Sequence, residues 1–171
     1  MKTATLAAAC LLLSVLTVFQ FCVKPPYYPD EPAIVFKSIS KTLMRQSVLS
    51  LPADSVLVTF TYTDGDGDLG SEDGSDKSAV FYIDQRDSFS LTPYTLPYIE
   101  PQGTGNGISG EISVLLPSVK CIHTDASGNT TVGLNVPVDL DTLVYIIYIR
   151  DRAGHESNRI VTPPITLICK Q

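Results

Sequence analysis

Apolar and polar residues alternate along positions 55–63 of the chain. The apolar side chains on one face are those of Val56, Val58, Phe60 and Tyr62. A period of two predicts a β-strand with one buried face. The segment 143–150 is instead apolar on both faces and rich in β-branched and aromatic residues, which predicts a central strand that is packed on both sides or covered in part by a loop.

The other apolar segments are short and are separated by turn residues. They predict strands over residues 34–39, 79–83, 112–116, 131–136 and 160–168. Pro163 and Pro164 interrupt the last segment, which places it at a sheet edge or splits it. Residues 41–49 allow at most a turn or two of helix. About seven short strands predict an all-β fold, an antiparallel β-sandwich, and the strand count fits an immunoglobulin-like arrangement better than a closed barrel.

The N-terminus has the pattern of an export segment. Lys2 is followed by an uncharged, mostly apolar run that ends at Lys24. Residues 1–21 therefore predict a signal peptide. It resembles a bacterial lipoprotein signal, which would make Cys22 the lipidated first residue and residues 22–32, with four prolines, an extended tether. Phe21 departs from the small residue usual before such a cysteine, so a retained membrane anchor is the alternative.

Residues 33–171 have the length of a single domain. The whole chain carries 18 acidic and 12 basic residues, a formal net charge of −6. This balance argues against a nucleic-acid partner, because phosphate binding favours a basic surface.

Cys121 and Cys169 are the two cysteines in the predicted exported body. In an oxidising compartment the default expectation is a disulfide between them. The alternative is a zinc site, since His123 and Asp125 lie close to Cys121. The usual paired-ligand spacing of zinc sites is absent, which favours the disulfide.

The predicted strand at 55–63 runs into a markedly acidic loop. Asp64, Asp66 and Asp68 occupy alternate positions with glycines between them, and six of the 18 acids lie between residues 64 and 76. Carboxylates this close repel one another unless a cation or a partner offsets their charge, and calcium prefers oxygen ligands. The loop is a candidate calcium site. The alternative is an ordinary turn in which Asp-Gly pairs bend the chain and acids keep it soluble.

Two loops together carry a resemblance to a known group of proteins. They are Thr63–Gly70 and Asp151–Asn158, and the second resembles the Asp-x-Ala-Gly-Asn hairpin common in bacterial immunoglobulin-like domains. With the signal and tether, the chain resembles bacterial cell-envelope lipoproteins built on one such sandwich, a group with no established activity. The resemblance implies an outer-membrane lipoprotein, periplasmic or surface-facing. His155 replaces the usual Asn of the hairpin, and Ile147 stands where antibody domains have a cysteine.

In an immunoglobulin-like sandwich, the loop after the second strand and the loop before the last strand lie at the same end. Asp151 is then expected to face the acidic loop, with Glu72 or Glu156 completing the set of ligands. The expected role of calcium is structural, because the ion neutralises the carboxylates and joins two loops that otherwise repel each other.

Tyr94 and Tyr98 lie in a proline-rich segment that could serve as a partner platform. Tyrosines that cover a sandwich edge are the alternative. The sequence predicts no enzyme: His155, Asp151 and Ser157 are too close in sequence for the geometry of a catalytic triad. The expected function is a non-catalytic, lipid-anchored binding or assembly module whose partner is an envelope protein or a glycan. A structural spacer and a small accessory hydrolase are the alternatives.

Overall fold

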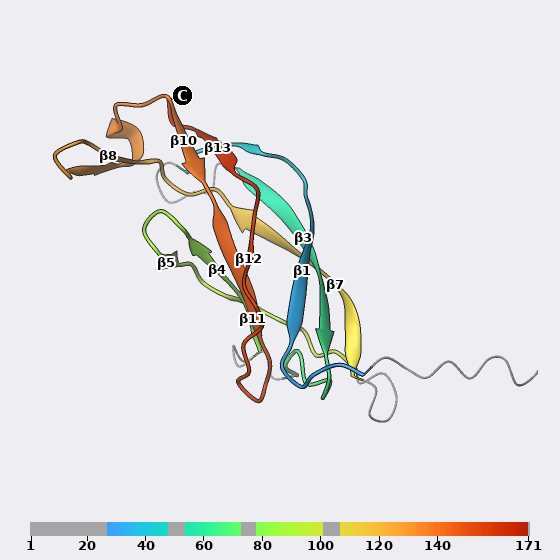
Figure 1. Cartoon of the computed structure of the whole chain (residues 1–171). Helices are drawn as coiled ribbons and strands as arrows, with labels where there is room; N and C mark the ends of the chain where they lie inside the picture. Colours follow the sequence, from blue (N-terminus) through green and yellow to red (C-terminus); the bar gives the residue numbers. More distant parts are fainter. Residues whose placement is uncertain (1–26, 48–53, 73–77, 101–106, 171) are drawn as a thin grey trace, which may run out of the picture.

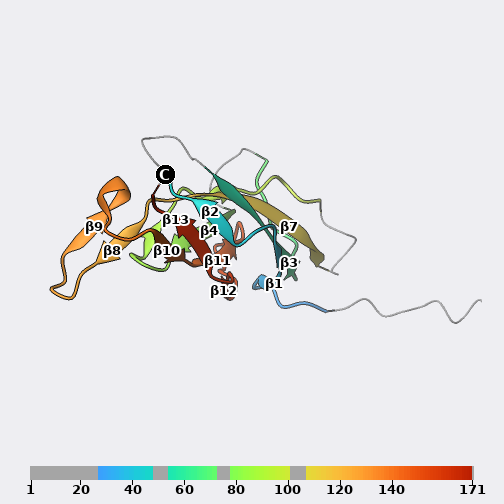
Figure 2. The same ribbon diagram turned by 90° about the horizontal axis from the view of Figure 1, so that it is seen from above.

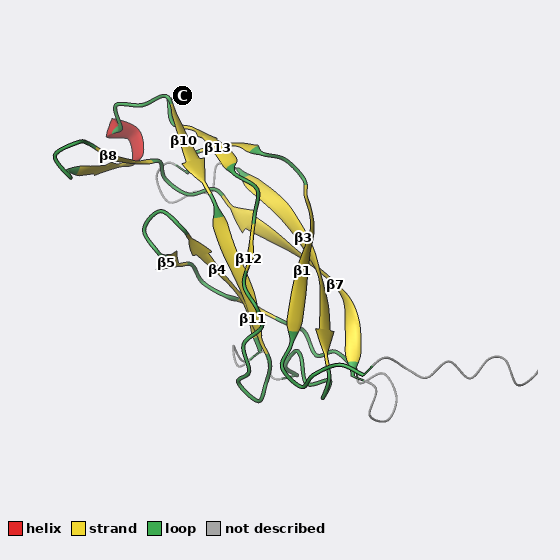
Figure 3. Cartoon of the chain, in the orientation of Figure 1, coloured by secondary structure: helices red, strands yellow, loops and turns green. Residues whose placement is uncertain are grey.

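The computed structural model describes residues 27–47, 54–72, 78–100 and 107–170. Almost all regular structure in this part of the chain is β-strand, and a single 3-10 turn, Gly133–Asn135, is the only helical element there (Figure 3). The predicted all-β fold is confirmed.

One sheet contains three antiparallel strands in the order β1–β3–β7. These strands are β1 (Ala33–Ile39), β3 (Ser55–Asp64) and β7 (Ile108–Pro117). The central strand β3 buries Val56, Val58 and Phe60 completely, whereas Leu57 on the other face is 41% exposed. The alternation of residue types therefore predicted the buried face correctly.

The other large sheet has the order β12–β11–β4–β5, and β6 also pairs with β4. Its strands are β4 (Ala79–Asp84), β5 (Phe89–Ser90), β6 (Tyr94–Thr95), β11 (Tyr145–Arg150) and β12 (Ile160–Val161). β11 lies between β12 and β4, in the central position that was predicted. It buries every second residue, and the residues between them are half-buried, so the second face is covered only in part.

A smaller sheet extends the pair of strands β11 and β12, because β10 runs into β11 and β13 follows β12. β10 (Leu140–Leu143) pairs with β13 (Ile165–Ile168), which also pairs in parallel with β2 (Leu43–Arg45). β12 and β13 are separated at the proline pair, as predicted. Thr162 bridges the break, since its N–H donates to the Tyr145 carbonyl at 3.0 Å and its hydroxyl accepts from the Tyr145 N–H at 3.0 Å.

Side chains from these sheets share one hydrophobic core. Phe60 and Tyr62 of β3, Tyr82 of β4, Ile147 of β11 and Leu167 of β13 all belong to it. The β1–β3–β7 sheet lies beside the sheets that contain β4, β11 and β13 (Figures 1 and 2). This arrangement is consistent with a β-sandwich.

The described part of the segment 41–49 contains no helical turn, which is within the limit of a turn or two set by the sequence, because the short strand β2 forms there and pairs with β13. One local prediction was wrong. The predicted strand 131–136 ends early: β9 (Thr130–Val132) pairs with β8 (Ile122–Thr124) in a projecting hairpin, and a 3-10 turn follows. In both cases pairing with a distant or neighbouring strand decided the structure.

The predicted disulfide joins Cys121 and Cys169 at the end of the molecule near the C-terminus. Cys121 is consequently unavailable as a zinc thiolate. The fully buried Gln46 links the two cysteine backbones, because its amide nitrogen donates to the Cys169 carbonyl and its amide oxygen accepts from the Cys121 N–H at 3.1 Å.

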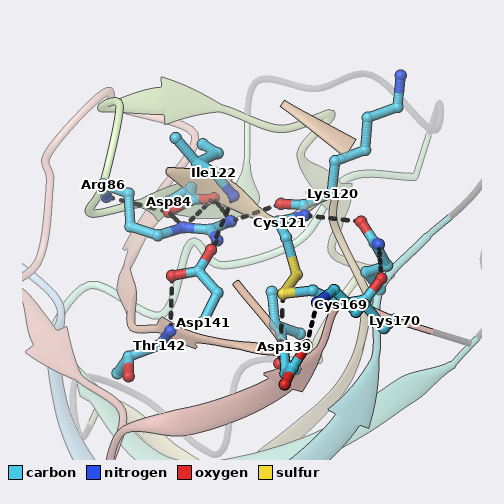
Figure 4. Close-up of a disulfide and its surroundings, with 12 residues drawn as sticks. Asp84, Arg86, Lys120, Cys121, Ile122, Asp139, Asp141, Thr142, Cys169 and Lys170 are labelled. Atoms are coloured by element: carbon cyan, nitrogen blue, oxygen red, sulfur yellow. Dashed lines mark hydrogen bonds and ion pairs between the residues drawn. A yellow bond between two sulfur atoms is a disulfide. The ribbon is translucent and has the colours of Figure 1, made fainter. Parts of the chain in front are cut away.

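An internal ion-pair cluster lies next to the disulfide (Figure 4). The Arg86 guanidinium contacts Asp84 at 2.6 Å and also contacts Asp141. Asp141 in turn accepts a hydrogen bond from the Ile122 N–H at 2.8 Å. At this end of the molecule, two nearly buried carboxylates share a cation supplied by the protein itself.

Replacing both Cys121 and Cys169 with serine should lower the free energy of unfolding by roughly 4 kcal/mol, because the bond closes a long loop in the unfolded chain. Urea unfolding followed by circular dichroism measures the difference. The wild-type protein under reducing conditions is the control and should match the double variant. Equal unfolding midpoints for the oxidised wild type and the variant would contradict a stabilising bond.

Candidate metal centre

Four aspartates from two loops meet at the end of the molecule opposite the disulfide. Asp64 ends β3, Asp66 and Asp68 follow it, and Asp151 follows the end of β11. Each offers a carboxylate oxygen, and these oxygens all lie within 4.8 Å of one another. Figure 1 shows the lower ends of β3 and β11 at this end of the molecule. The structure thus brings together the four aspartates that the sequence analysis placed in one group.

Hydrogen bonds from the backbone shape the two loops around these carboxylates. Asp64 Oδ2 accepts from the Asp68 N–H at 3.0 Å, which closes the acidic turn. Asp151 Oδ1 accepts from the N–H groups of Gly154 and His155 at 2.6 and 2.8 Å. Short Asp side chains commonly bond the backbone a few residues ahead in this way, so each loop is built by its own first aspartate.

A hydrogen bond between the loops fixes their relative position. Asp68 Oδ2 accepts from the Ala153 N–H at 2.9 Å. Nearby, Arg152 donates to the Gly70 carbonyl at 2.8 Å and its guanidinium lies 5.3 Å from the centre of the Tyr98 ring. These contacts join the β3–β4 loop to the β11–β12 loop, and this role of Arg152 was not predicted from the sequence.

Two buried oxygens in the group have no hydrogen-bond partner in the part of the chain that the structure describes. They are Oδ1 of Asp64, whose residue is 0% exposed, and Oδ1 of Asp68. Buried carboxylate oxygens are normally satisfied by donors or by metal ions. Both unpartnered atoms belong to the same four-residue group, so one cation could satisfy them together.

Burial and the closeness of the carboxylates raise pKa values within the group. Burial raises the pKa of Asp64 to about 7, and the neighbouring Asp66 and Asp68 carboxylates add to this shift. The pKa of Asp68 is also raised, first by burial and then by Asp151 and Asp66. A group of carboxylates that resists ionisation is stabilised when a cation binds its charged form.

His155 provides a partial counter-charge at the edge of the group. Its Nδ1 lies 2.9 Å from Asp151 Oδ2, and this hydrogen bond raises the pKa of the imidazole. The side chain is 43% exposed, so its charge is well solvated. It holds Asp151 in place but does not reach the unpartnered oxygens of Asp64 and Asp68.

The two glutamates expected to complete the site are not in the four-residue group. Glu72 is exposed on the far part of the acidic loop. Glu156 forms a β-bridge with Arg150, and its carboxylate lies 3.8 Å from Arg159. Glu156 pairs with Arg150, and its partner Arg159 lies over the Tyr148 ring, so Glu156 contacts the face of β11 that carries Tyr148 and Arg150, and Asp151 is the next residue in the alternation.

The start of the described chain also contacts the acidic loop. A Cβ atom placed on Gly65 would lie 2.4 Å from the carbonyl oxygens of Tyr28 and Pro29, so only glycine allows this approach. Farther along, the Asn158 side chain bonds both the N–H and the carbonyl of Ile34, at 2.8 and 2.9 Å. The chain therefore enters the domain beside the metal-site candidate, at a position where the sequence has glycine.

The two tyrosines expected to form one platform have separate surroundings. Tyr94 stacks on Tyr82 with ring centroids 5.5 Å apart and donates its hydroxyl proton to the Leu115 carbonyl. Tyr98 instead contacts Arg152 beside the acidic group. Tyr94 therefore contacts the edge strand β7, and Tyr98 contacts the loop that carries Arg152.

The hydroxyl of Ser157 is engaged away from His155. Its Oγ accepts from the Ile149 N–H at 3.0 Å and donates to the Asn158 carbonyl at 2.8 Å. Ser157 therefore closes the β11–β12 hairpin and is not oriented as a nucleophile toward the imidazole.

The predicted signal peptide 1–21, Cys22 and the first part of the predicted tether lie outside the described residues. Within the described part of the chain, no helix has the length and apolar character needed to cross a membrane. Comparison with protein-family models, curated proteins and solved structures finds no match to this chain. Its function must therefore be inferred from the geometry and chemistry of its own residues.

In a buffer that contains a chelator of divalent cations, the protein should lose thermal stability as the pH rises from about 4 to about 7. The raised pKa of Asp64 means that the folded state keeps a proton which the unfolded chain releases in this window, so rising pH favours unfolding. Melting curves across this pH range measure the effect. Asp64→Asn removes the titrating group and should flatten the curve; a wild-type melting temperature that rises through the window would contradict the burial effect.

Proposed function

We propose that this chain is a lipid-anchored protein of the bacterial cell envelope whose sandwich is a non-catalytic binding or assembly module with a calcium-held loop end. The observation that carries the calcium site is the pair of buried, unpartnered oxygens of Asp64 and Asp68 inside a group of four carboxylates. A single divalent cation satisfies both oxygens and offsets the repulsion within the group.

The ligand chemistry favours calcium. All four residues of the group offer carboxylate oxygens, the ligands of hard cations. Two ligands on opposite sides of a calcium ion, each at about 2.4 Å, lie about 4.8 Å apart. The oxygens of the group fall within that spread. Magnesium requires a tighter octahedral set of ligands.

A contrast within the molecule supports an external cation. Near the disulfide, Asp84 and Asp141 share the guanidinium of Arg86. At the opposite end, four carboxylates gather, and the cations placed beside them among the described residues are the exposed His155 and the neighbouring Arg152. The first cluster is neutralised by the chain itself, whereas the second is left with an excess of negative charge.

The sheet order supports an immunoglobulin-like arrangement. β1, β3 and β7 form one antiparallel sheet. The hairpin strands β10–β11 and β12–β13 lie between β4 on one side and β2 on the other. Such an arrangement places the β3–β4 and β11–β12 loops at one end. The meeting of Asp64 and Asp151 is in keeping with this topology.

The surface supports a binding role over a catalytic one. A cavity of about 340 Å³ beside Arg86 contains several charged residues, but the guanidinium is already bonded to Asp84, Asp141 and the Lys120 carbonyl. A second cavity, of about 410 Å³, lies beside Tyr94 and is mainly apolar. An apolar surface at Tyr94 favours a module that binds an envelope protein or a glycan over a bare spacer or an accessory hydrolase.

Calorimetry should detect calcium binding to the chain from residue 23 onward, which retains the hydrophobic core between Ile34 and Cys169. Asp64→Asn should abolish the binding heat, because it removes a buried ligand charge. Asp139→Asn is the matched control: it makes the same charge change at an exposed site paired with Lys170 and should bind like the wild type. Absence of binding heat at millimolar calcium would refute the calcium site.

The lipid anchor is tested separately in a bacterial host. The wild-type protein should partition into the detergent phase of a membrane extract, with a mass that lacks residues 1–21 and includes a lipid on Cys22. Cys22→Ser should lose the lipid mass. A wild-type protein that retains residues 1–21 in the membrane would instead establish an uncleaved anchor.

A further inference from the structure

The strand β7 forms one edge of the β1–β3–β7 sheet. Its ten residues pair with β3 on one side. Just beyond this pairing, the Ser118 N–H donates to the Asp54 carbonyl at 2.8 Å. Because backbone direction alternates in antiparallel pairs, even-numbered residues of β7 direct their N–H and C=O groups toward β3, and odd-numbered residues direct theirs away from it.

Two tyrosines cover one half of this outer edge. The hydroxyl of Tyr145 donates to the Pro117 carbonyl at 2.7 Å, and that of Tyr94 donates to the Leu115 carbonyl. Within the described residues, no backbone group or side chain pairs with the outward N–H and C=O groups of Ser109, Glu111 and Ser113. Half of the edge is thus an open row of hydrogen-bonding groups.

An apolar groove of about 410 Å³ runs beside this open edge. It lies between β7 of one sheet and β6 of the other. Its walls include the largely buried side chains of Tyr62, Val80, Leu96 and Val114. Glu111 is the only charged residue among its lining residues.

We propose that an extended segment of a partner protein binds here as an added strand beside β7. The unpaired backbone groups require a partner with an extended backbone, because only a strand presents donors and acceptors at the matching spacing. Alternate side chains of that strand point into the groove, so the segment carries apolar residues at every second position.

The charge of the protein surface limits the charge of the segment that can bind there. The protein has a net charge of −6, and Glu111 lies at the edge itself, where its carboxylate also contacts Lys37. An acidic segment is repelled by this surface, so the bound segment is neutral or basic. The inference rests on the proposed binding role and names the partner as a strand-forming polypeptide; it does not depend on the calcium site.

The probe is a short fluorescent peptide with valine and threonine at alternating positions and a lysine at each end. Fluorescence anisotropy should show saturable binding to the chain from residue 23 onward. The same peptide with alternate backbone nitrogens methylated should not bind, because it cannot donate to the β7 carbonyls. Amide exchange at Ser109, Glu111 and Ser113 should slow when the unmodified peptide is bound.

Two variants locate the binding site, each with a matched control. Ser113→Pro removes one outward N–H and should weaken binding roughly fivefold or more, whereas Ser113→Ala keeps that N–H and should bind like the wild type. Thr95→Trp fills the groove from its exposed rim and should also weaken binding, whereas Thr92→Trp lies outside the groove and should not. The Thr95 pair keeps the test valid if the proline variant does not fold.

Failure of the unmodified peptide to bind, or equal binding of the methylated peptide, would overturn the inference. So would affinity that is unchanged in both Ser113→Pro and Thr95→Trp. If sedimentation shows a dimer without peptide that Ser113→Pro dissociates, the edge belongs to a second copy of this chain and the partner-strand inference is wrong. Calcium calorimetry on the same samples separates this result from the proposed function: Asp64→Asn should lose calcium binding and keep peptide binding.

Discussion

Mutual repulsion among four carboxylates governs the end of the molecule where β3 and β11 terminate. Asp64 and Asp151 are fully buried, and Asp66 and Asp68 lie beside them. Backbone N–H groups satisfy some of the oxygens, yet Oδ1 of both Asp64 and Asp68 is left without a donor. The conformation of both loops therefore depends on how the remaining negative charge is offset, by protons or by a cation.

Buried negative charge is offset differently at the two ends of the molecule. Near the C-terminus, Arg86 lies between two carboxylates and a disulfide closes the structure covalently. At the opposite end, the chain enters over Gly65, directly against the acidic loop. In the proposed envelope protein, a cation bound there would also stabilise the contact between the tether and the domain. The reason is that Tyr28 and Pro29 pack against Gly65, which belongs to the loop that holds the ligands.

The open half of β7 gives the molecule a third region, separate from both ends in its chemistry. The disulfide end is neutralised within the chain and the acidic end has the chemistry of a cation site. The β7 edge instead combines unpaired backbone groups with an apolar groove. Tyr94 belongs to this region and Tyr98 to the acidic end, so the proline-rich segment between them joins two different surfaces.

The sequence by itself determined the features that arise from short-range patterns. Alternation predicted β3 and its buried face, the proline pair predicted the break between β12 and β13, and the spacing of Asp64, Asp66 and Asp68 identified the acidic turn. The expected order of strands in the sandwich also predicted that Asp151 faces this turn. Only the tertiary structure decided that Glu72 and Glu156 lie outside the group, that β2 pairs with β13, that Arg152 contacts Gly70, and that half of β7 is open. These features depend on contacts between residues far apart in the chain, and no local period in the sequence encodes which strand edge is covered or which carboxylate oxygen lacks a donor.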